Sequence, residues 1–260
     1  MFRLLFAQLK KLFLRTDVKW ILAVFALLPF GIAALIRAES GIIQIGSSVF
    51  NALGYASVVV GLLGSLLLIN VCVALTAASL VSREIDSGLD SMYVAKVRSR
   101  GQILLSKLTA MDMLIFAIFL ALAASAVAGW FVFLKDSPFG TAVFWAGGDD
   151  DLFTLVYTVV GSLFETLAMS RVFILFSVLF KYGKAVIFNF VTIVVLKLLA
   201  NIELLQKWIP SYIGAGTHLA QYSGEALLRE GMYSIALLAG YALVLSIVDY
   251  MIYRRMDLSR

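Results

Sequence analysis

The sequence predicts an all-α integral membrane protein: a single transmembrane domain, residues 1–260, built on six membrane-spanning helices. Of its 260 residues, 62% are hydrophobic and only 14% are charged, whereas about a quarter of the residues in soluble domains are charged. Six apolar runs each provide the ~20 residues that a helix needs to cross a bilayer. No stretch between these runs exceeds about thirty residues, which is too short for a soluble domain.

Residues 1–17 form an amphipathic segment that we expect to be an interfacial helix. Its apolar side chains share one face at helical spacing: Phe2, Leu5, Phe6, Leu9, Leu12 and Phe13. The remaining faces carry Arg3, Lys10, Lys11 and Arg15, which would meet lipid headgroups. A secretory signal is the alternative, and it is less favoured because no clear A-x-A cleavage site follows the polar leader.

The predicted spans follow in order: Val18–Ile36, Asn51–Val81, Leu108–Leu134, Leu152–Phe180, Ala185–Leu205 and Met232–Tyr253. The second is longer than a bilayer requires, so we expect one long helix that tilts or protrudes. Only Pro29 interrupts a span. Between spans five and six, residues 206–231 are apolar but broken by Pro210, Gly214, Gly216 and Gly224. This segment predicts a pair of short re-entrant helices at the outer side.

The basic residues predict the orientation. Fifteen Lys and Arg residues fall in the N-terminal segment, the loop 82–107, the turn between spans four and five, and the C-terminus, against four in the opposite loops. Because loops rich in Lys and Arg stay in the cytoplasm, both termini and loop 82–107 are expected there. The bases lie in short clusters beside apolar runs, a pattern that favours lipid headgroups over nucleic acid as their partner.

Several ionisable or polar residues lie within the predicted spans, where an unpaired charge costs several kcal/mol. The candidates for a function there are Asn70, Glu165, Arg171, Lys197 and Asn201. Spans four and five are joined by a tight turn, so we expect them to be antiparallel neighbours with Glu165 paired to Lys197. Asp112 and Asp249 are expected to meet bases at the cytoplasmic boundary.

The motifs of common enzymes do not occur in this sequence. It has one cysteine, Cys72, and one histidine, His218, so no internal disulfide and no His/Cys metal site are expected. Gly183-Lys184 lacks the upstream glycine and the hydroxyl residue of a phosphate-binding loop. The sequence also contains neither G-x-S-x-G nor H-E-x-x-H. We therefore expect no catalytic residues, no metal and no bound cofactor in this chain.

The charged loop 82–107 is the most informative stretch. Apolar residues recur at helical spacing within it, which predicts a short amphipathic helix. A solvated loop between two spans is the alternative to a docking element for a soluble partner. The residues that we single out here are Arg83, Glu84, Ile85, Gly88, Leu89, Met92, Arg98 and Arg100.

This pattern resembles the permease subunit of type 2 ABC exporters. A long second span runs into Arg83-Glu84, then Gly88, a short helix, Arg98-Ser99-Arg100, and a basic residue, Lys107, at the opening of span three. The six spans, the amphipathic N-terminal helix and the short outer helices before the last span are also similar. One departure is Lys96, where members of the family usually carry a proline.

The resemblance implies an ATP-driven exporter in a bacterial plasma membrane. Two permease subunits, identical or different, would form the translocation path and assemble with two copies of a separate ATP-binding subunit, which would bind ATP and Mg²⁺. The helix from Glu84 to Val97 would be the coupling helix seated in that subunit, with Glu84 bonded to a basic residue there.

Two other classes of function remain as alternatives. One is a secondary transporter driven by protons through Glu165, Asp112 or Asp249; such families tend to show internal repeats and broken spans, which the sequence does not suggest. The other is a membrane anchor or assembly factor without transport activity, which the charges within the spans disfavour.

Overall fold

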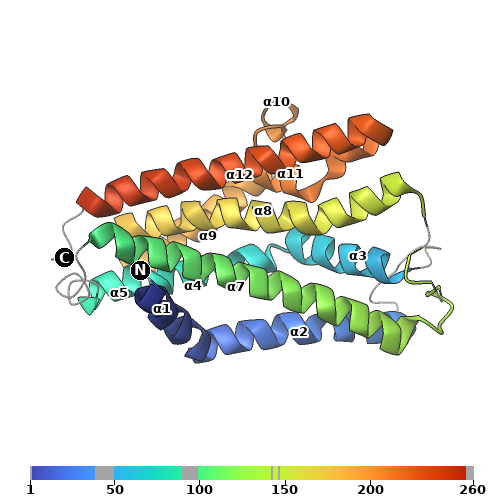
Figure 1. Ribbon diagram of the computed structural model, residues 1–260, viewed down its shortest axis with the longest axis horizontal. Helices are drawn as coiled ribbons and strands as arrows, with labels where there is room; N and C mark the ends of the chain where they lie inside the picture. The colour runs from blue at the N-terminus through green and yellow to red at the C-terminus, as the bar shows by residue number, and fades with distance from the viewer. Residues whose placement is uncertain (1, 39–49, 90–98, 142, 146, 256–260) are drawn as a thin grey trace.

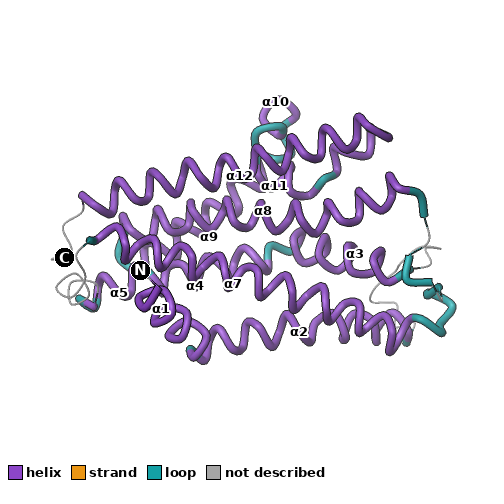
Figure 2. Tube along the Cα trace, viewed as in Figure 1, coloured by secondary structure: helices purple, strands orange, loops and turns teal. Residues whose placement is uncertain are grey.

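The computed structural model describes residues 2–38, 50–89, 99–141, 143–145 and 147–255. Within these ranges the chain is helical and contains no β-strand, only an isolated β-bridge between Phe50 and Gly140 (Figure 2). The helices run lengthwise beside one another in an elongated bundle (Figure 1). Six of them are long and apolar enough to cross a membrane, which agrees with the predicted all-α, six-span architecture.

The amphipathic N-terminal segment is helix α1, Phe2–Leu14, and it packs against α7. Leu12 is fully buried in this contact, whereas Phe6 is 70% exposed. Arg15 adopts an extended conformation between α1 and the first span, α2, Thr16–Arg37. Figure 1 shows the two helices meeting at an angle, so that α1 lies across the end of the bundle.

The second span is not the single long helix that we expected. It consists of α3, Ala52–Ser65, and α4, Leu68–Leu80. Leu67 stands between them with φ 61°, in the left-handed region that a leucine rarely occupies. Gly61, Gly64 and Ser65 precede the break and weaken the helix locally. Packing against neighbouring helices then sets the directions of the two halves, α3 on α7 and α8, and α4 on α8 and α9.

A five-residue helix, α5, Ser82–Asp86, follows α4. The chain turns just after this helix at Gly88, whose φ of 71° suits glycine. The predicted coupling helix was expected to continue to Val97, but residues 90–98 lie outside the described part. The third span is α7, Arg100–Gly129, and it continues as a π-helical turn, η1, Trp130–Leu134.

The fourth span, α8, Asp149–Leu179, lies at the centre of the bundle, in contact with α3, α4, α7, α9, α11 and α12. Three aspartates occupy its first turn, where negative charge is favoured by the helix dipole. After a tight turn the fifth span, α9, Tyr182–Leu199, runs back beside it. The sequence placed the end of this span six residues later, at Leu205.

The segment between spans five and six holds three short helices rather than two. They are α10, Glu203–Gln206, α11, Pro210–Ala215, and the 3₁₀ helix η2, Thr217–Gln221. The last span, α12, Gly224–Arg255, begins eight residues before the predicted start. Of the short helices, α11 lies against α8.

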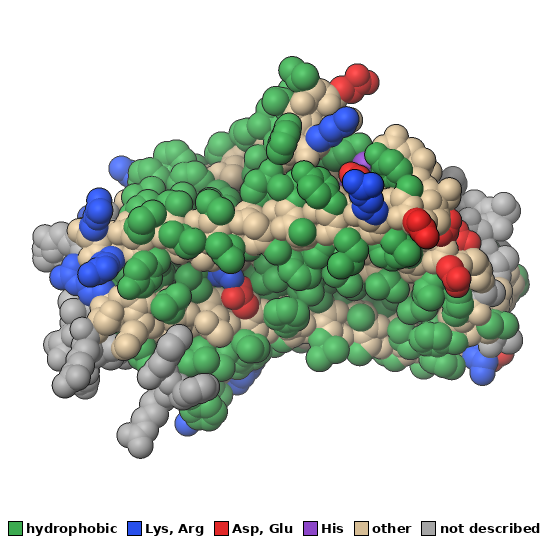
Figure 3. All heavy atoms as spheres, turned by 45° about the horizontal axis from the view of Figure 1, so that its top comes forward, with side chains coloured by type: hydrophobic (Ala, Val, Ile, Leu, Met, Phe, Trp, Pro, Cys, Tyr) green, Lys and Arg blue, Asp and Glu red, His purple; other side chains and the backbone are tan. Residues whose placement is uncertain are grey.

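Basic and acidic side chains are separated along the length of the molecule. Helix α1 and the last turn of α12 lie at the same end (Figure 1). Figure 3 shows Lys and Arg gathered near this end, Asp and Glu mainly near the opposite end, and an apolar surface between them. The basic residues of the described helices therefore gather mainly at one end of the bundle.

Candidate functional site

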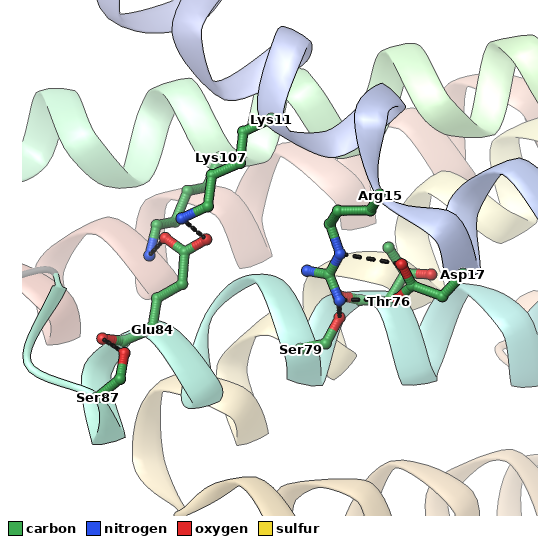
Figure 4. Close-up of polar contacts among 8 residues, drawn as sticks. All are labelled: Lys11, Arg15, Asp17, Thr76, Ser79, Glu84, Ser87 and Lys107. Atoms are coloured by element: carbon green, nitrogen blue, oxygen red, sulfur yellow. Dashed lines mark hydrogen bonds and ion pairs between the residues drawn. The ribbon is translucent and has the colours of Figure 1, made fainter.

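A buried ion-pair cluster joins three helices at the basic end of the bundle. The Glu84 carboxylate, on α5, lies between the ammonium groups of Lys11 on α1 and Lys107 on α7. Its oxygens are 2.8 Å from Lys11 Nζ and 3.2 Å from Lys107 Nζ (Figure 4). Glu84 is 4% exposed and Lys107 is fully buried. A fully buried lysine is rare and needs a paired carboxylate to offset its desolvation.

A second contact holds the α1–α2 junction to the same region. The Arg15 guanidinium donates to Ser79 Oγ on α4 at 2.9 Å and to both carboxylate oxygens of Asp17, at 2.7 and 3.1 Å. Figure 4 shows Arg15 reaching from the end of α1 toward α4. The N-terminal helix is thus tied at two points to the end of the second span.

Two further hydrogen bonds connect α5 with spans four and five. The Ser82 hydroxyl donates to the Ser177 carbonyl near the end of α8, at 2.6 Å. The Asp86 carboxylate accepts from the backbone N–H of Tyr182, the first residue of α9, at 2.8 Å. Three of the five residues of α5, Ser82, Glu84 and Asp86, therefore make specific polar contacts with α1, α7, α8 and α9. This set of contacts, with Arg15–Ser79, is the candidate functional site.

The structure gives the predicted loop residues different roles. Arg83 is exposed and Leu89 is 38% exposed, so both are accessible to a partner. Ile85 is 3% exposed and belongs to the core, while Arg100 is half-buried at the start of α7. Met92 and Arg98 lie outside the described residues.

Glu84 has ion-pair partners within its own chain that the sequence did not predict. We expected its carboxylate to bond to a basic residue of a partner, but in this structure it is buried and neutralised by two lysines of its own chain. From the sequence, Lys11 was expected to face lipid headgroups and Lys107 to open span three, and neither was paired with Glu84. A cue was present: Lys107 opens an apolar run, and a charge at such a position is easier to accommodate with a nearby acid.

The charges within the spans form two groups. Glu165 on α8 is 8% exposed and accepts a 3.4 Å hydrogen bond from the Asn70 amide on α4, just after the break in the second span. Gly214 of α11 packs directly on this carboxylate. The expected ion pair between Glu165 and Lys197 is not made, although the ammonium acts on the carboxylate electrostatically at longer range.

The second group lies nearer the basic end of α8. Arg171, 5% exposed, forms an ion pair with Asp112 of α7. Asp112 thus meets a base, as expected, but one from a neighbouring span. Asp249 of α12 is fully buried, interacts electrostatically with Arg171, and has no hydrogen-bond partner in the described part of the chain.

Asn201 and Glu203 lie outside the fifth span, because α9 ends at Leu199. The Asn201 amide donates to the Lys197 carbonyl at 3.0 Å, where it closes the helix end. Asn201 is exposed at this position.

No group of three or more His, Cys, Asp or Glu side chains that could hold a metal ion occurs among the described residues. No family model matches the sequence, and no curated protein matches it either.

Proposed function

We propose that this chain is the membrane-spanning permease subunit of an ATP-driven exporter of the type 2 ABC class. In this proposal a second permease subunit, identical or different, completes the translocation path. Two copies of a separate ATP-binding subunit supply the energy. The six candidate spans, the interfacial helix α1 and the short helices between spans five and six support this arrangement.

The observation that carries the proposal is the set of contacts around α5. This helix begins the charged segment 82–107 and is bonded to α1 and α7 by ion pairs and to α8 and α9 by hydrogen bonds. Because buried ion pairs hold a defined geometry, a displacement of this segment would move the ends of four helices together. A solvated connecting loop does not require such contacts, whereas a segment that transmits movement from a soluble ATP-binding subunit does.

The partner would contact the exposed residues of this segment rather than Glu84. Arg83 and Leu89 offer a charge and an apolar side chain beside the buried cluster. Glu84 would transmit force inside the permease, by holding α1 and α7 to α5. This division of roles refines the sequence-based hypothesis, in which Glu84 itself reached the ATP-binding subunit.

A second permease subunit has a suitable surface. In the most apolar 18-residue stretch of α9, only 17% is buried within the chain, and in that of α12 only 11% is buried. A wholly apolar groove of about 250 Å³ lies between α4 and α9, lined by residues such as Val71, Leu75 and Phe190. In the proposed assembly, spans two and five face the translocation path, and lipid covers the rest of the apolar surface.

Affinity purification of the tagged chain from its native membranes tests the proposal. We expect an ATP-binding subunit to copurify in equal amount and the complex to hydrolyse ATP. Arg83→Glu should abolish this association, whereas Arg229→Glu, an exposed arginine near the opposite end, should leave it intact. Purification without any ATP-binding protein, even after crosslinking in the membrane, would contradict the proposal.

The broken second span favours one other candidate, a proton-coupled transporter. Interrupted helices beside a buried carboxylate are typical of secondary transporters, and Glu165 lies next to α4 and α11 in this way. The purified chain in liposomes, without ATP or a partner, would then carry protons along a pH gradient. Glu165→Gln would stop that flux, and Glu203→Gln, an exposed glutamate in α10, would not.

A further inference from the structure

A cavity of about 340 Å³ lies between the segment 206–222 and the first third of α12. It is separate from the ion-pair cluster: Figure 1 shows α10 and α11 away from α1 and α5, which carry that cluster. Its size suits a small organic molecule. Its lining includes four aromatic residues, a histidine and one acid, which together decide the ligand chemistry that it suits: Trp208, Tyr212, Tyr222, Tyr233, His218 and Glu230.

Contacts with α8 and α12 hold the walls of this cavity in place. His218 Nε2 lies 3.0 Å from the hydroxyl of Ser234, which is 4% exposed on α12. The imidazole ring also packs edge-on to Tyr157 at 6.3 Å and beside Tyr212 at 5.7 Å, measured between ring centroids. The Trp208 carbonyl accepts from the Tyr241 hydroxyl at 3.2 Å, which fixes the chain at that residue.

The electrostatics of the cavity favour a cation. The Glu230 carboxylate is half-buried and makes no ion pair with any residue of the described part. Burial lowers the pKa of His218 from its usual 6.5, against an opposing effect of Glu230, so the imidazole is neutral at pH 7. Lys207 also borders the cavity, but it is exposed, where water and salt screen its charge.

We propose that this cavity binds a small organic cation, an alkylammonium group whose charge faces Glu230 and whose carbon atoms contact the aromatic rings. Tyr and Trp faces attract such cations through their ring quadrupoles, and the attraction grows when water is excluded. Trp208 is 62% exposed and Tyr233 is 59% exposed, so a ligand in the cavity would cover aromatic surface that this chain leaves open.

Other ligand classes fit less well. A divalent metal ion requires several oxygen ligands from the protein or from water, and Glu230 is the one carboxylate among the residues lining the cavity. An anion would meet the Glu230 charge and a neutral His218. The alkylammonium group could belong to a free amine or to a lipid headgroup. The proposal stands apart from the permease assignment, because no part of it requires an ATP-binding subunit.

Equilibrium binding of radiolabelled choline to the purified chain tests the proposal. The chain is placed in nanodiscs of phosphatidylglycerol, which carries no ammonium group. We expect saturable binding at one site per chain, and no competition from the neutral analogue in which carbon replaces the nitrogen of choline. Glu230→Gln should weaken binding by about tenfold, the size of effect expected when a partly desolvated charge contact is lost.

Two controls separate binding from folding. Glu225→Gln removes an equal charge from an exposed position on the same helix, outside the cavity, and should leave choline binding unchanged. Tyr233 is exposed, so neither of its variants should disturb the fold: Tyr233→Phe should keep the affinity, and Tyr233→Leu should lower it. The proposal is overturned if choline does not saturate, if the neutral analogue competes equally, or if Glu230→Gln binds like the wild type.

The source of the ammonium group is distinguished by repeating the titration in phosphatidylcholine nanodiscs. Weaker apparent choline binding in these discs supports a lipid headgroup as the natural occupant, because the lipid then competes for the cavity. Unchanged binding supports a free amine.

Discussion

Lys107 shows how far the environment of one residue decides its role. In the sequence it is a base at the opening of an apolar run, which suggests contact with headgroups. In the fold it is fully buried and paired with Glu84. Lys11 binds the other oxygen of the same carboxylate, but its side chain is 35% exposed. The two lysines therefore contribute differently to stability.

We expect Lys107→Met to destabilise the protein by about 3 kcal/mol, because removal of one partner of a buried ion pair strands the other charge. Lys11→Met should cost about 1 kcal/mol or less, since the Lys11 ammonium is accessible to water. Unfolding of the purified protein in detergent, followed by circular dichroism, measures both.

Coupling between the partners provides the control for this prediction. In the double variant Glu84→Gln/Lys107→Met, the loss of stability should be clearly smaller than the sum of the two single losses. Equal losses for Lys11→Met and Lys107→Met would show that burial does not set the strength of these contacts.

At the scale of elements, the contact between α11 and α8 places a short helix beside the middle of the fourth span. Gly214 makes the close approach possible. A Cβ atom at this position would lie 2.5 Å from Glu165 Cβ and 2.8 Å from its carboxylate oxygen Oε2. Both distances are far shorter than ordinary van der Waals contact.

Gly214→Ala should therefore force α11 away from α8, at a cost of about 1–3 kcal/mol, typical of overpacking in a tight contact. Gly240→Ala is the matched control, because a Cβ atom at Gly240 would have no neighbour within 4 Å. Gly240 lies inside α12, where alanine is favoured over glycine by about 1 kcal/mol. Thermal unfolding compares the two, and a Gly214→Ala variant as stable as Gly240→Ala would refute this packing.

The elements themselves were predicted unequally well. The six spans follow from apolar length, which is a local property of the chain, and all six were identified. The break at Leu67 was missed because leucine has no preference for positive φ. The preceding glycines indicate that the helix is weak in this region, but they do not indicate at which residue it breaks. The third short helix and the early start of α12 were missed because the glycines and Pro210 signal interruptions without defining which residues resume the helix.

At the scale of the whole molecule, the basic and acidic ends predict one orientation in the membrane. The basic end, with α1 and the end of α12, should face the cytoplasm. Labelling of single cysteines tests this. Cys72 is the only cysteine, so Cys72→Ala provides the background. Lys181→Cys and Glu225→Cys then place one thiol at an exposed position near each end.

A membrane-impermeant maleimide should label the Glu225→Cys variant in intact cells. It should label the Lys181→Cys variant only after the membrane is permeabilised. The reverse pattern would place segment 82–107 outside the cell, and a cytoplasmic ATP-binding subunit could not then reach Arg83.

The sequence by itself determined that the chain is helical, that six of its segments are long and apolar enough to span a membrane, and that its basic residues gather at one end. These features depend on hydrophobic length and charge position, which act through the surrounding lipid and water. Only the tertiary structure decided which charges meet. Glu84 turned inward to two lysines, Glu165 met Asn70 rather than Lys197, and Arg171 met Asp112. Partners of this kind depend on helix rotation and on the break at Leu67, and these are set by packing among distant segments.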